Sequence, residues 1–304
     1  MTSFEEFKSI IGDNKFGVSI GNFDGVHLGH QNLLGEFLAE CGKKSLASVV
    51  YTFTPHPALY FDPAKNHLIT SYKKKVALIK ELGVDYVVEL EFNKDLQNMT
   101  AKEFSQSNLL CFKSLKLLWV GHDFTFGKDK KDPKWIEELK QDVQFKRHSA
   151  FQVNHETVSS SLIRNYLMEG SIALANTLLG REFSIVGEVV KGKQLGRELG
   201  FPTLNIMPEY PFLIPALGVY KVRCKIDSEI YLGLMNLGRN PSVDSDGKIK
   251  IEVHLLDFAR DVYGEEVEVI VDDYIREERK FDNIEELKLQ IKRSEEHTSE
   301  LQSL

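Results

Sequence analysis

The feature that most constrains the fold is a change of pattern along the chain near residues 180–184. Before it, short apolar runs of strand length alternate with helix-like stretches. After it, strand-like segments follow one another, separated by Gly, Pro, Asn and Asp. Alternation predicts an α/β domain with a Rossmann-like parallel sheet, whereas consecutive short strands predict an antiparallel β-barrel. The sequence therefore predicts two domains, at 1–181 and 182–293.

The expected elements follow from the apolar pattern. In the first domain, strands are expected at 16–21, 45–53, 86–92 and 115–121. Helices are expected at 30–44, 71–83, 100–112, 132–143, 160–170 and 171–180. In the second domain, strands are expected at 183–193, 218–227, 229–238, 248–258 and 265–275, and an amphipathic closing helix at 283–293.

Length, charge and cysteine content limit the class of protein. A chain of 304 residues is long for one hydrophobic core, and a formal charge of −7 argues against nonspecific nucleic-acid binding. No apolar run approaches the ~18 residues of a membrane span, and the first residues lack the pattern of a signal peptide. The cysteines are Cys41, Cys111 and Cys224, far apart and without CxxC spacing. We expect reduced thiols and a cytoplasmic protein without membrane or nucleic-acid partners; the oligomeric state stays open.

The strongest local signal is GNFDGVHLGH at 21–30, between an expected strand and an expected helix. Glycines let a backbone approach phosphate closely, and a helix N-terminus offers N–H groups and a positive dipole end. His27 and His30 are expected to project from one helix face and to stabilise charge on a transferring phosphate. For an isolated pair, a structural and a solvated histidine would be the alternative, and a metal site would need a third ligand. The other residues expected to bind nucleotide here are Gly21, Asn22, Phe23, Asp24, Gly25 and Gly29.

This segment resembles the GxFDGxHxGH signature of bacterial bifunctional riboflavin kinase/FAD synthetases. Three further segments are similar to motifs of that family: TFTPHP at 52–57, GHDFTFG at 121–127 and SSSLIR at 159–164. Ser161 stands where the family has Thr. The resemblance implies that His56 and Asp123 lie near the flavin.

The residue types of the SSSLIR segment also indicate a function without the resemblance. A serine run that opens a helix supplies an N-cap and hydroxyl donors, and a guanidinium one turn later suits bidentate phosphate contact. Alone, such a segment is more often simply a capped helix. Beside the histidine motif, we expect Ser159 and Ser160 to bind nucleotide and Arg164 to bind phosphate.

The second signal is VKGKQLGRELGFPTLN at 190–205, rich in glycine and basic residues. It suits a loop that folds over phosphates, although the GK[ST] ending of a Walker loop is missing and a polar hairpin is the alternative. Thr203 and Asn205 point to one face of an extended segment and are neutral oxygen ligands suited to Mg²⁺, with ATP phosphates supplying the balancing charge. The residues expected to bind nucleotide are Lys193, Gly196, Gly200 and Pro202.

GRELGFPTLNI resembles the GRxLGFPTxN signature of riboflavin kinases. IEVHLLDF at 251–258 is similar to their VExHLLDF strand, and the family assigns its Glu, here Glu252, as the base that activates the riboflavin 5′-hydroxyl. The resemblance of 275–281 to IRxExKF places Arg276 near flavin or nucleotide. Ser242 replaces a Thr of the family. Residues 294–304 match nothing in it and resemble a translated adapter sequence, so we exclude them.

The resemblance implies two reactions: riboflavin and ATP to FMN, then FMN and ATP to FAD and pyrophosphate, with Mg²⁺ in both. FMN is the nucleophile of the second step, so catalysis by His27, His30 and Arg164 would rest on positioning and charge neutralisation. Three alternatives stay open. One half could be inactive, or the chain could bind flavin without turnover. An aminoacyl-tRNA synthetase is disfavoured by the acidic charge, the short chain and the missing KMSKS-type loop.

Overall fold

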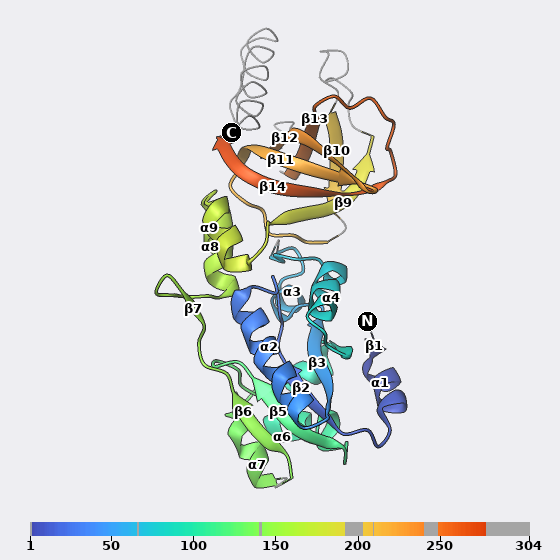
Figure 1. The fold of residues 1–304 in the computed structure, drawn as a ribbon, viewed down its shortest axis with the longest axis vertical. Helices are drawn as coiled ribbons and strands as arrows, with labels where there is room; N and C mark the ends of the chain where they lie inside the picture. The colour runs from blue at the N-terminus through green and yellow to red at the C-terminus, as the bar shows by residue number, and fades with distance from the viewer. Residues whose placement is uncertain are drawn as a thin grey trace. The chain divides into compact units, whose positions relative to one another are not determined.

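The computed structural model describes residues 2–65, 67–139, 142–191, 203–208, 210–239 and 249–277 (Figure 1). The chain divides into two compact units, Met1–Ser160 and Ser161–Leu304. The predicted boundary at 181/182 lies later, after the two helices α8 (Ser160–Met168) and α9 (Ile172–Leu179), and stays a prediction.

The first unit contains a six-stranded sheet in which every pair is parallel. Its order is β1 (Thr2–Ser3), β4 (Tyr86–Glu91), β3 (Ala47–Thr54), β2 (Phe16–Ile20), β5 (Leu115–Val120) and β6 (Gln144–Arg147). The predicted parallel sheet and its four inner strands are confirmed. The edge strands β1 and β6 were missed because they are short and carry no long apolar run.

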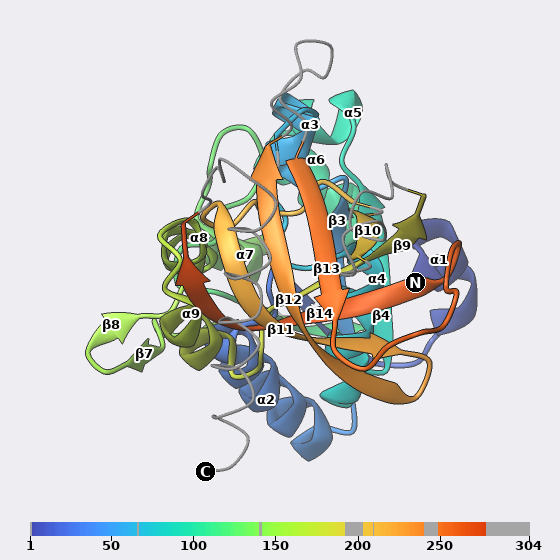
Figure 2. The ribbon, with the colours of Figure 1, turned by 90° about the horizontal axis from the view of Figure 1, so that it is seen from above.

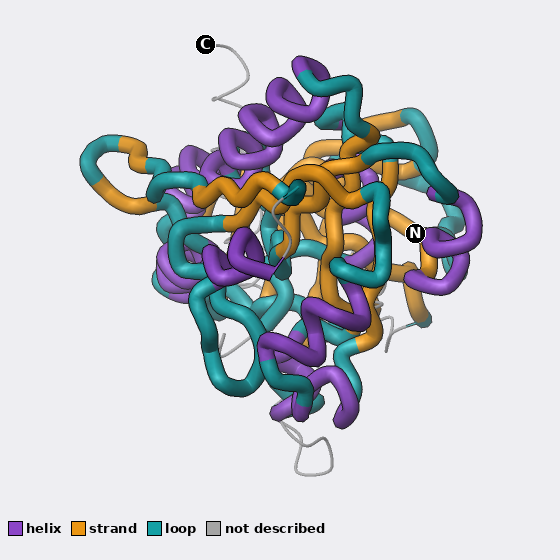
Figure 3. Tube along the Cα trace, turned by 90° about the horizontal axis from the view of Figure 1, so that it is seen from below, coloured by secondary structure: helices purple, strands orange, loops and turns teal. Residues whose placement is uncertain are grey.

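Helices cover both faces of this sheet (Figure 3, helices in purple). They are α1 (Phe4–Ile11), α2 (Leu28–Lys43), α3 (Pro57–Phe61), α4 (Tyr72–Glu81), α5 (Lys94–Asn98), α6 (Ala101–Asn108), the 3₁₀ turn η1 (Pro133–Trp135) and α7 (Ile136–Leu139). One core cluster packs Phe7 and Phe104 on the sheet, and a second packs Phe37 and Ile79. All five residues of β2 are buried, as a strand covered on both faces requires. A short hairpin, β7 (Gln152–Val153) and β8 (Glu156–Thr157), precedes α8.

The second unit contains a closed antiparallel barrel in the order β10-β13-β12-β11-β14-β9. The strands are β9 (Ser184–Val190), β10 (Thr203–Pro208), β11 (Gly218–Ile226), β12 (Glu229–Arg239), β13 (Ile249–Leu255) and β14 (Glu266–Arg276) (Figure 2). The predicted barrel and its five predicted strands are confirmed. The segment with Thr203 and Asn205, which was expected only to be extended, is a sixth strand, β10. Alternate apolar side chains fill the core, among them Ile206, Tyr220, Met235, Ile251 and Val253. The predicted helix at 283–293 lies outside the described residues.

Candidate active sites

The first site is built on the glycine loop, residues 21–27, which joins the carboxyl end of β2 to α2. Two of its non-glycine residues have left-handed backbone angles, Phe23 with φ +49° and Val26 with φ +39°. Such angles cost about 1–2 kcal/mol each, so contacts from elsewhere must hold the loop. Ligands of parallel sheets bind beyond this edge.

Asp24 supplies some of these contacts from inside the loop. Its buried carboxylate accepts hydrogen bonds from the backbone N–H groups of Ile69 and Thr70, at 3.1–3.3 Å. The Ser160 hydroxyl donates to the backbone oxygen of Asp24 at 2.8 Å. Asp24 and Ser160 therefore tie the loop to distant segments, and a direct contact of either with nucleotide stays a prediction.

The two histidines lie together at the start of α2, as expected. His27 is the N-cap, and its Nδ1 accepts the backbone N–H of His30 at 3.3 Å. Since Nδ1 is the acceptor, the proton of a neutral His27 ring is on Nε2. The two rings stack with centroids 3.6 Å apart, and Phe23 packs its edge against His30 at 5.2 Å. A Cβ on Gly29 would lie 3.2 Å from the His27 ring, which explains the glycine between the histidines.

Sequence reasoning missed a buried lysine beneath the glycine loop. Lys75 on α4 is 3% exposed, and its Nζ donates to the Thr52 hydroxyl at 2.8 Å and to the Asn22 carbonyl at 3.2 Å. The Thr52 hydroxyl also donates to Asn22 at 3.1 Å. Burial lowers the pKa of Lys75 to about 8, opposed by the charges of Asp24 and Glu89. The run of three lysines at 73–75 looks like a solvated helix face, so the sequence carries no signal for this role.

The residues predicted to lie near the flavin follow two other strands of the same sheet. His56 caps α3, because its ring atom Nδ1 accepts the backbone N–H of Ala58 at 3.1 Å. The backbone N–H of His56 donates to the Tyr72 hydroxyl at 2.7 Å. Asp123 follows β5, with a side chain 82% exposed. Both lie in loops beyond the carboxyl ends of the strands, where the glycine loop also lies.

An aromatic cluster near His56 was also missed. Tyr60, Phe61 and Phe92 pack edge to face with centroids 5.2–6.2 Å apart, and Phe53 joins them through Phe92 at 6.0 Å. Phe61 is 64% exposed, which is unusual for a phenylalanine. These rings belong to β3, α3 and the residue after β4, so tertiary structure brings them together.

The remaining residues predicted for this site lie in α8 and just before it. Ser159 directly precedes the helix. Arg164 lies one turn into α8 and belongs to the second compact unit. Contact of either residue with phosphate stays a prediction.

The second site lies on the outer face of the barrel. The strand register aligns Asn205 of β10 with Glu252 of β13, and Glu252 with Asn236 of β12. The alignment continues through Val219 of β11 to Arg276 of β14. We call this row the polar rung; directly opposite residues have Cβ atoms about 4.5–5.5 Å apart. The register thus makes the predicted metal ligand Asn205 a direct neighbour of the predicted base Glu252.

Two neighbours complete the surroundings of the rung. Thr203 pairs with His254 and lies two residues from Asn205, so the two predicted metal ligands share one face, as expected. Lys250, two residues before Glu252, places its Nζ 2.5 Å from Oε1 of that carboxylate in a half-exposed ion pair. Asn236 and Lys250 were not predicted to belong to the site, because strand register is not visible in a single sequence.

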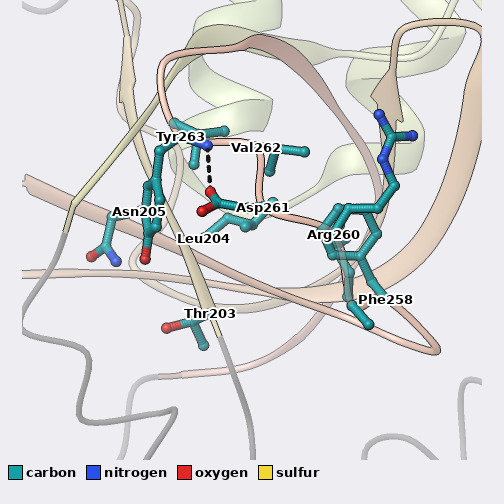
Figure 4. Close-up of a pocket in the computed structure, with 11 residues that line it drawn as sticks. Thr203, Leu204, Asn205, Phe258, Arg260, Asp261, Val262 and Tyr263 are labelled. Atoms are coloured by element: carbon teal, nitrogen blue, oxygen red, sulfur yellow. Dashed lines mark hydrogen bonds between the residues drawn. The ribbon is translucent and has the colours of Figure 1, made fainter.

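A pocket of about 330 Å³ adjoins the rung. Thr203 and Asn205 of β10 line it together with residues of the segment between β13 and β14, including Asp261 and Tyr263 (Figure 4). The Tyr263 N–H donates to Asp261 Oδ1 at 3.2 Å, which orders this segment. Lys193, Gly196, Gly200 and Pro202, predicted to bind nucleotide, lie outside the described residues.

The composition of the site restricts how it could hold a metal. Within the described ranges, no group of three or more His, Cys, Asp or Glu is placed to bind a metal ion. Thr203 and Asn205 are neutral oxygen donors, so they fit an Mg²⁺ ion whose charge is balanced by nucleotide phosphates. In the part of the chain that the structure describes, no helix combines the length and apolar character needed to cross a membrane.

Comparison with known proteins matches a family model to each of two stretches of the chain. The FAD synthetase family model matches residues 11–162, and the riboflavin kinase family model matches residues 179–302. Curated relatives include bifunctional riboflavin kinase/FMN adenylyltransferases of Pseudomonas fluorescens, 37% identical over 90% of this chain and 88% of the relative, and of Escherichia coli K12, 38% identical over 91% and 90%. The chain belongs to this family.

A solved structure covers almost the same length. It is described as a macrolide-efflux protein from Streptococcus pneumoniae, with a TM-score of 0.85, 31% identity and coverage of 96% of both chains. The predicted family itself is confirmed by the two family models and by the curated relatives, which cover about 90% of the chain. The riboflavin kinase match reaches residue 302, into the segment 294–304 that we excluded; the origin of that segment stays a prediction.

Proposed function

We propose that the barrel unit phosphorylates riboflavin with ATP to FMN, and that the parallel-sheet unit transfers AMP from ATP to FMN, giving FAD and pyrophosphate. The observation that carries the first step is the polar rung, which makes Asn205 and Glu252 direct neighbours. The second step rests on the stacked His27 and His30 at the N-terminus of α2.

For riboflavin phosphorylation, Glu252 accepts the proton of the riboflavin 5′-hydroxyl. The 5′-oxygen of riboflavin forms a bond to the γ-phosphorus of ATP, and the bond between this phosphorus and ADP breaks. Thr203 and Asn205 would hold Mg²⁺, which neutralises charge on the phosphates. The nucleotide occupies the adjoining pocket, because its phosphates must reach Thr203 and Asn205. Lys250 holds the Glu252 carboxylate in place until substrate arrives.

For adenylyl transfer, an oxygen of the FMN phosphate attacks the α-phosphorus of ATP, and the bond to pyrophosphate breaks. The second pKa of a phosphate monoester is about 6, so FMN needs no general base at neutral pH. His27 donates through Nε2, since its Nδ1 accepts from the backbone. His30 and the hydroxyl of Ser159 add charge and donors around the same phosphates, and Arg164 is proposed to supply its guanidinium to the same step.

The flavin acceptor of this step has support of its own. The exposed Phe61 and its half-buried partners Tyr60 and Phe92 form an aromatic cluster near His56. An isoalloxazine ring is a large planar heterocycle that stacks well on such surfaces. His56 and Asp123 bind the polar edge of the flavin or its phosphate.

The cytoplasmic location is part of the proposal: none of the three cysteines, all in described segments, is in a disulfide.

Incubation with riboflavin, ATP and Mg²⁺ followed by chromatography of the flavins tests the proposal. We expect FMN to form first and FAD to follow. A parallel incubation that starts from FMN isolates the second step. Unchanged riboflavin would mean that the chain binds flavin without turnover, and FMN without FAD would mean that the parallel-sheet unit is inactive.

A further inference from the structure

The segment that leads into α4, together with the first turns of that helix, holds two loops of the adenylyl-transfer site. Ile69 and Thr70 bond the Asp24 carboxylate, the Tyr72 hydroxyl accepts the N–H of His56, and Lys75 bonds the glycine loop. Of these, only Lys75 brings a charge, and it does so from a position that is 3% exposed. A buried ammonium needs a reason, because desolvation opposes its charged form.

We infer that Lys75 is a positioning residue for adenylyl transfer: its ammonium group holds the glycine loop in the conformation that orients His27 and His30, and it places a positive charge beneath the bound phosphates. This inference rests on the proposed function of the parallel-sheet unit.

A short series of contacts leads from Lys75 to the histidines. The Nζ atom bonds the carbonyl of Asn22, whose neighbour Phe23 has the left-handed angle of φ +49°. The Phe23 ring then packs its edge against His30, and the His30 ring stacks on His27. A change in the loop at Asn22 therefore reaches the two imidazoles through direct contacts.

Loop stability alone does not require the charge. The Asn22 carbonyl already accepts a hydrogen bond from Thr52 at 3.1 Å, so loss of the amine leaves it satisfied. Burial lowers the pKa of Lys75, and the carboxylates of Asp24 and Glu89 oppose this effect without matching it. A methionine of similar length would fit a purely structural position at least as well. The charge is thus retained against stability, as is typical of functional sites.

The variant Lys75→Met separates the two roles. We expect kcat for FAD formation from FMN and ATP to fall by about tenfold or more, with a smaller change in KM for FMN. FMN formation from riboflavin reports on the barrel unit and should stay unchanged. The midpoint of urea unfolding should not fall. Lys73→Met, at an exposed position of the same helix, should keep both activities.

The pH profile gives a readout that a structural role would not change. FAD formation by the wild type should decline above about pH 8, where Lys75 loses its proton, and this decline should be missing in Lys75→Met. Asp24 and Glu89 are the charged groups that act on Lys75, and Tyr72, whose ring lies 5.1 Å from Nζ, has a pKa raised by burial. Because burial raises the pKa of this tyrosine from its ordinary value of 10, its titration does not account for a decline near pH 8.

A second variant tests the network. Thr52→Val keeps the ammonium but removes the hydroxyl that joins it to the loop, so FAD formation should fall less than in Lys75→Met. The double variant should lose less than the product of the two single losses.

The possible outcomes separate the inference from the proposed function. Wild-type protein that makes no FAD would overturn the proposed function. Wild-type protein that makes FAD, with Lys75→Met matching its rate and pH profile, would overturn the role of Lys75 alone. Loss of both activities together with a lower urea midpoint would also overturn it, because Lys75 would then act only in folding.

Discussion

The two proposed active sites are assembled in different ways. In the parallel-sheet unit, the proposed site is made of loops after β2, β3 and β5, and the glycine loop between β2 and α2 is joined to its surroundings by hydrogen bonds of Asp24, Lys75 and Thr52. In the barrel unit, the key side chains lie on strands, and the strand register alone makes Asn205 and Glu252 neighbours. A loop site depends on a surrounding network, whereas a strand site depends on register. Mutations should therefore act on the two sites differently.

The largest effect is expected at the strand site. Glu252→Gln keeps the shape of the side chain but cannot accept the proton of the 5′-hydroxyl, so FMN formation should fall by about 10²–10⁴-fold. FAD formation from added FMN should be unaffected. Glu188→Gln, at an exposed strand position of the same barrel, is the matched control. A Glu252→Gln protein that still makes FMN at the wild-type rate would remove this residue from the mechanism.

The next largest effect is expected at the loop site. His27→Ala together with His30→Ala removes donors to the transferring phosphate, so FAD formation should fall by about 10²–10³-fold, as measured with FMN and ATP. His155→Asn, in an exposed turn, serves as control. FMN formation should not change. Near-normal FAD formation in the double variant would contradict the proposed role of the histidines.

The buried Lys75 of the loop site also predicts that the free energy of unfolding depends on pH. The pKa of Lys75 is about 8 when folded and 10.5 in the unfolded chain, which corresponds to a cost of about 3 kcal/mol when the group is charged in both states. Between these values the unfolded state binds more protons, so wild-type stability rises with pH. Lys75→Met should be more stable by up to about 3 kcal/mol at pH 7, and the gap should close between pH 8 and 10.5. Urea unfolding measures this, and a gap independent of pH would show that burial does not lower the pKa of Lys75.

The smallest effect is expected from the metal ligands. Asn205→Ala removes one neutral donor while the phosphates still bind Mg²⁺, so the Mg²⁺ concentration for half-maximal FMN formation should rise by about tenfold. Thr203→Val should act in the same direction. The Mg²⁺ dependence of FAD formation should stay as in the wild type. If neither variant changes the Mg²⁺ concentration for half-maximal FMN formation, Thr203 and Asn205 do not bind the metal.

Much of the fold followed from the sequence, because inner strands and long helices carry strong apolar periodicity. The parallel sheet and the barrel were both predicted, whereas β1 and β6 were not, since four residues or fewer give no period. Of the predicted helix at 132–143, the described residues form a 3₁₀ turn and one turn of α7.

The sites were predicted only as far as they are local. His27 and His30 are three residues apart, so helix geometry alone brings them together. The roles of Lys75 and of the aromatic cluster around Phe61 could not be predicted from the sequence. The hydrogen-bond partners of Lys75 are 23 and 53 residues away, and the rings of the cluster lie on separate elements. Asp24 shows the reverse limit: its motif suggests a ligand contact, whereas the structure shows its carboxylate accepting hydrogen bonds from the backbone N–H groups of Ile69 and Thr70.

The polar rung has a consequence for how the barrel tolerates insertions and deletions. Side chains alternate between the outside and the core, so removal of one residue within β13 before Glu252 would turn this carboxylate inward and place Val253 in the rung. The barrel would then have to bury a charge or shift the whole strand. Length changes in this strand are therefore expected in pairs.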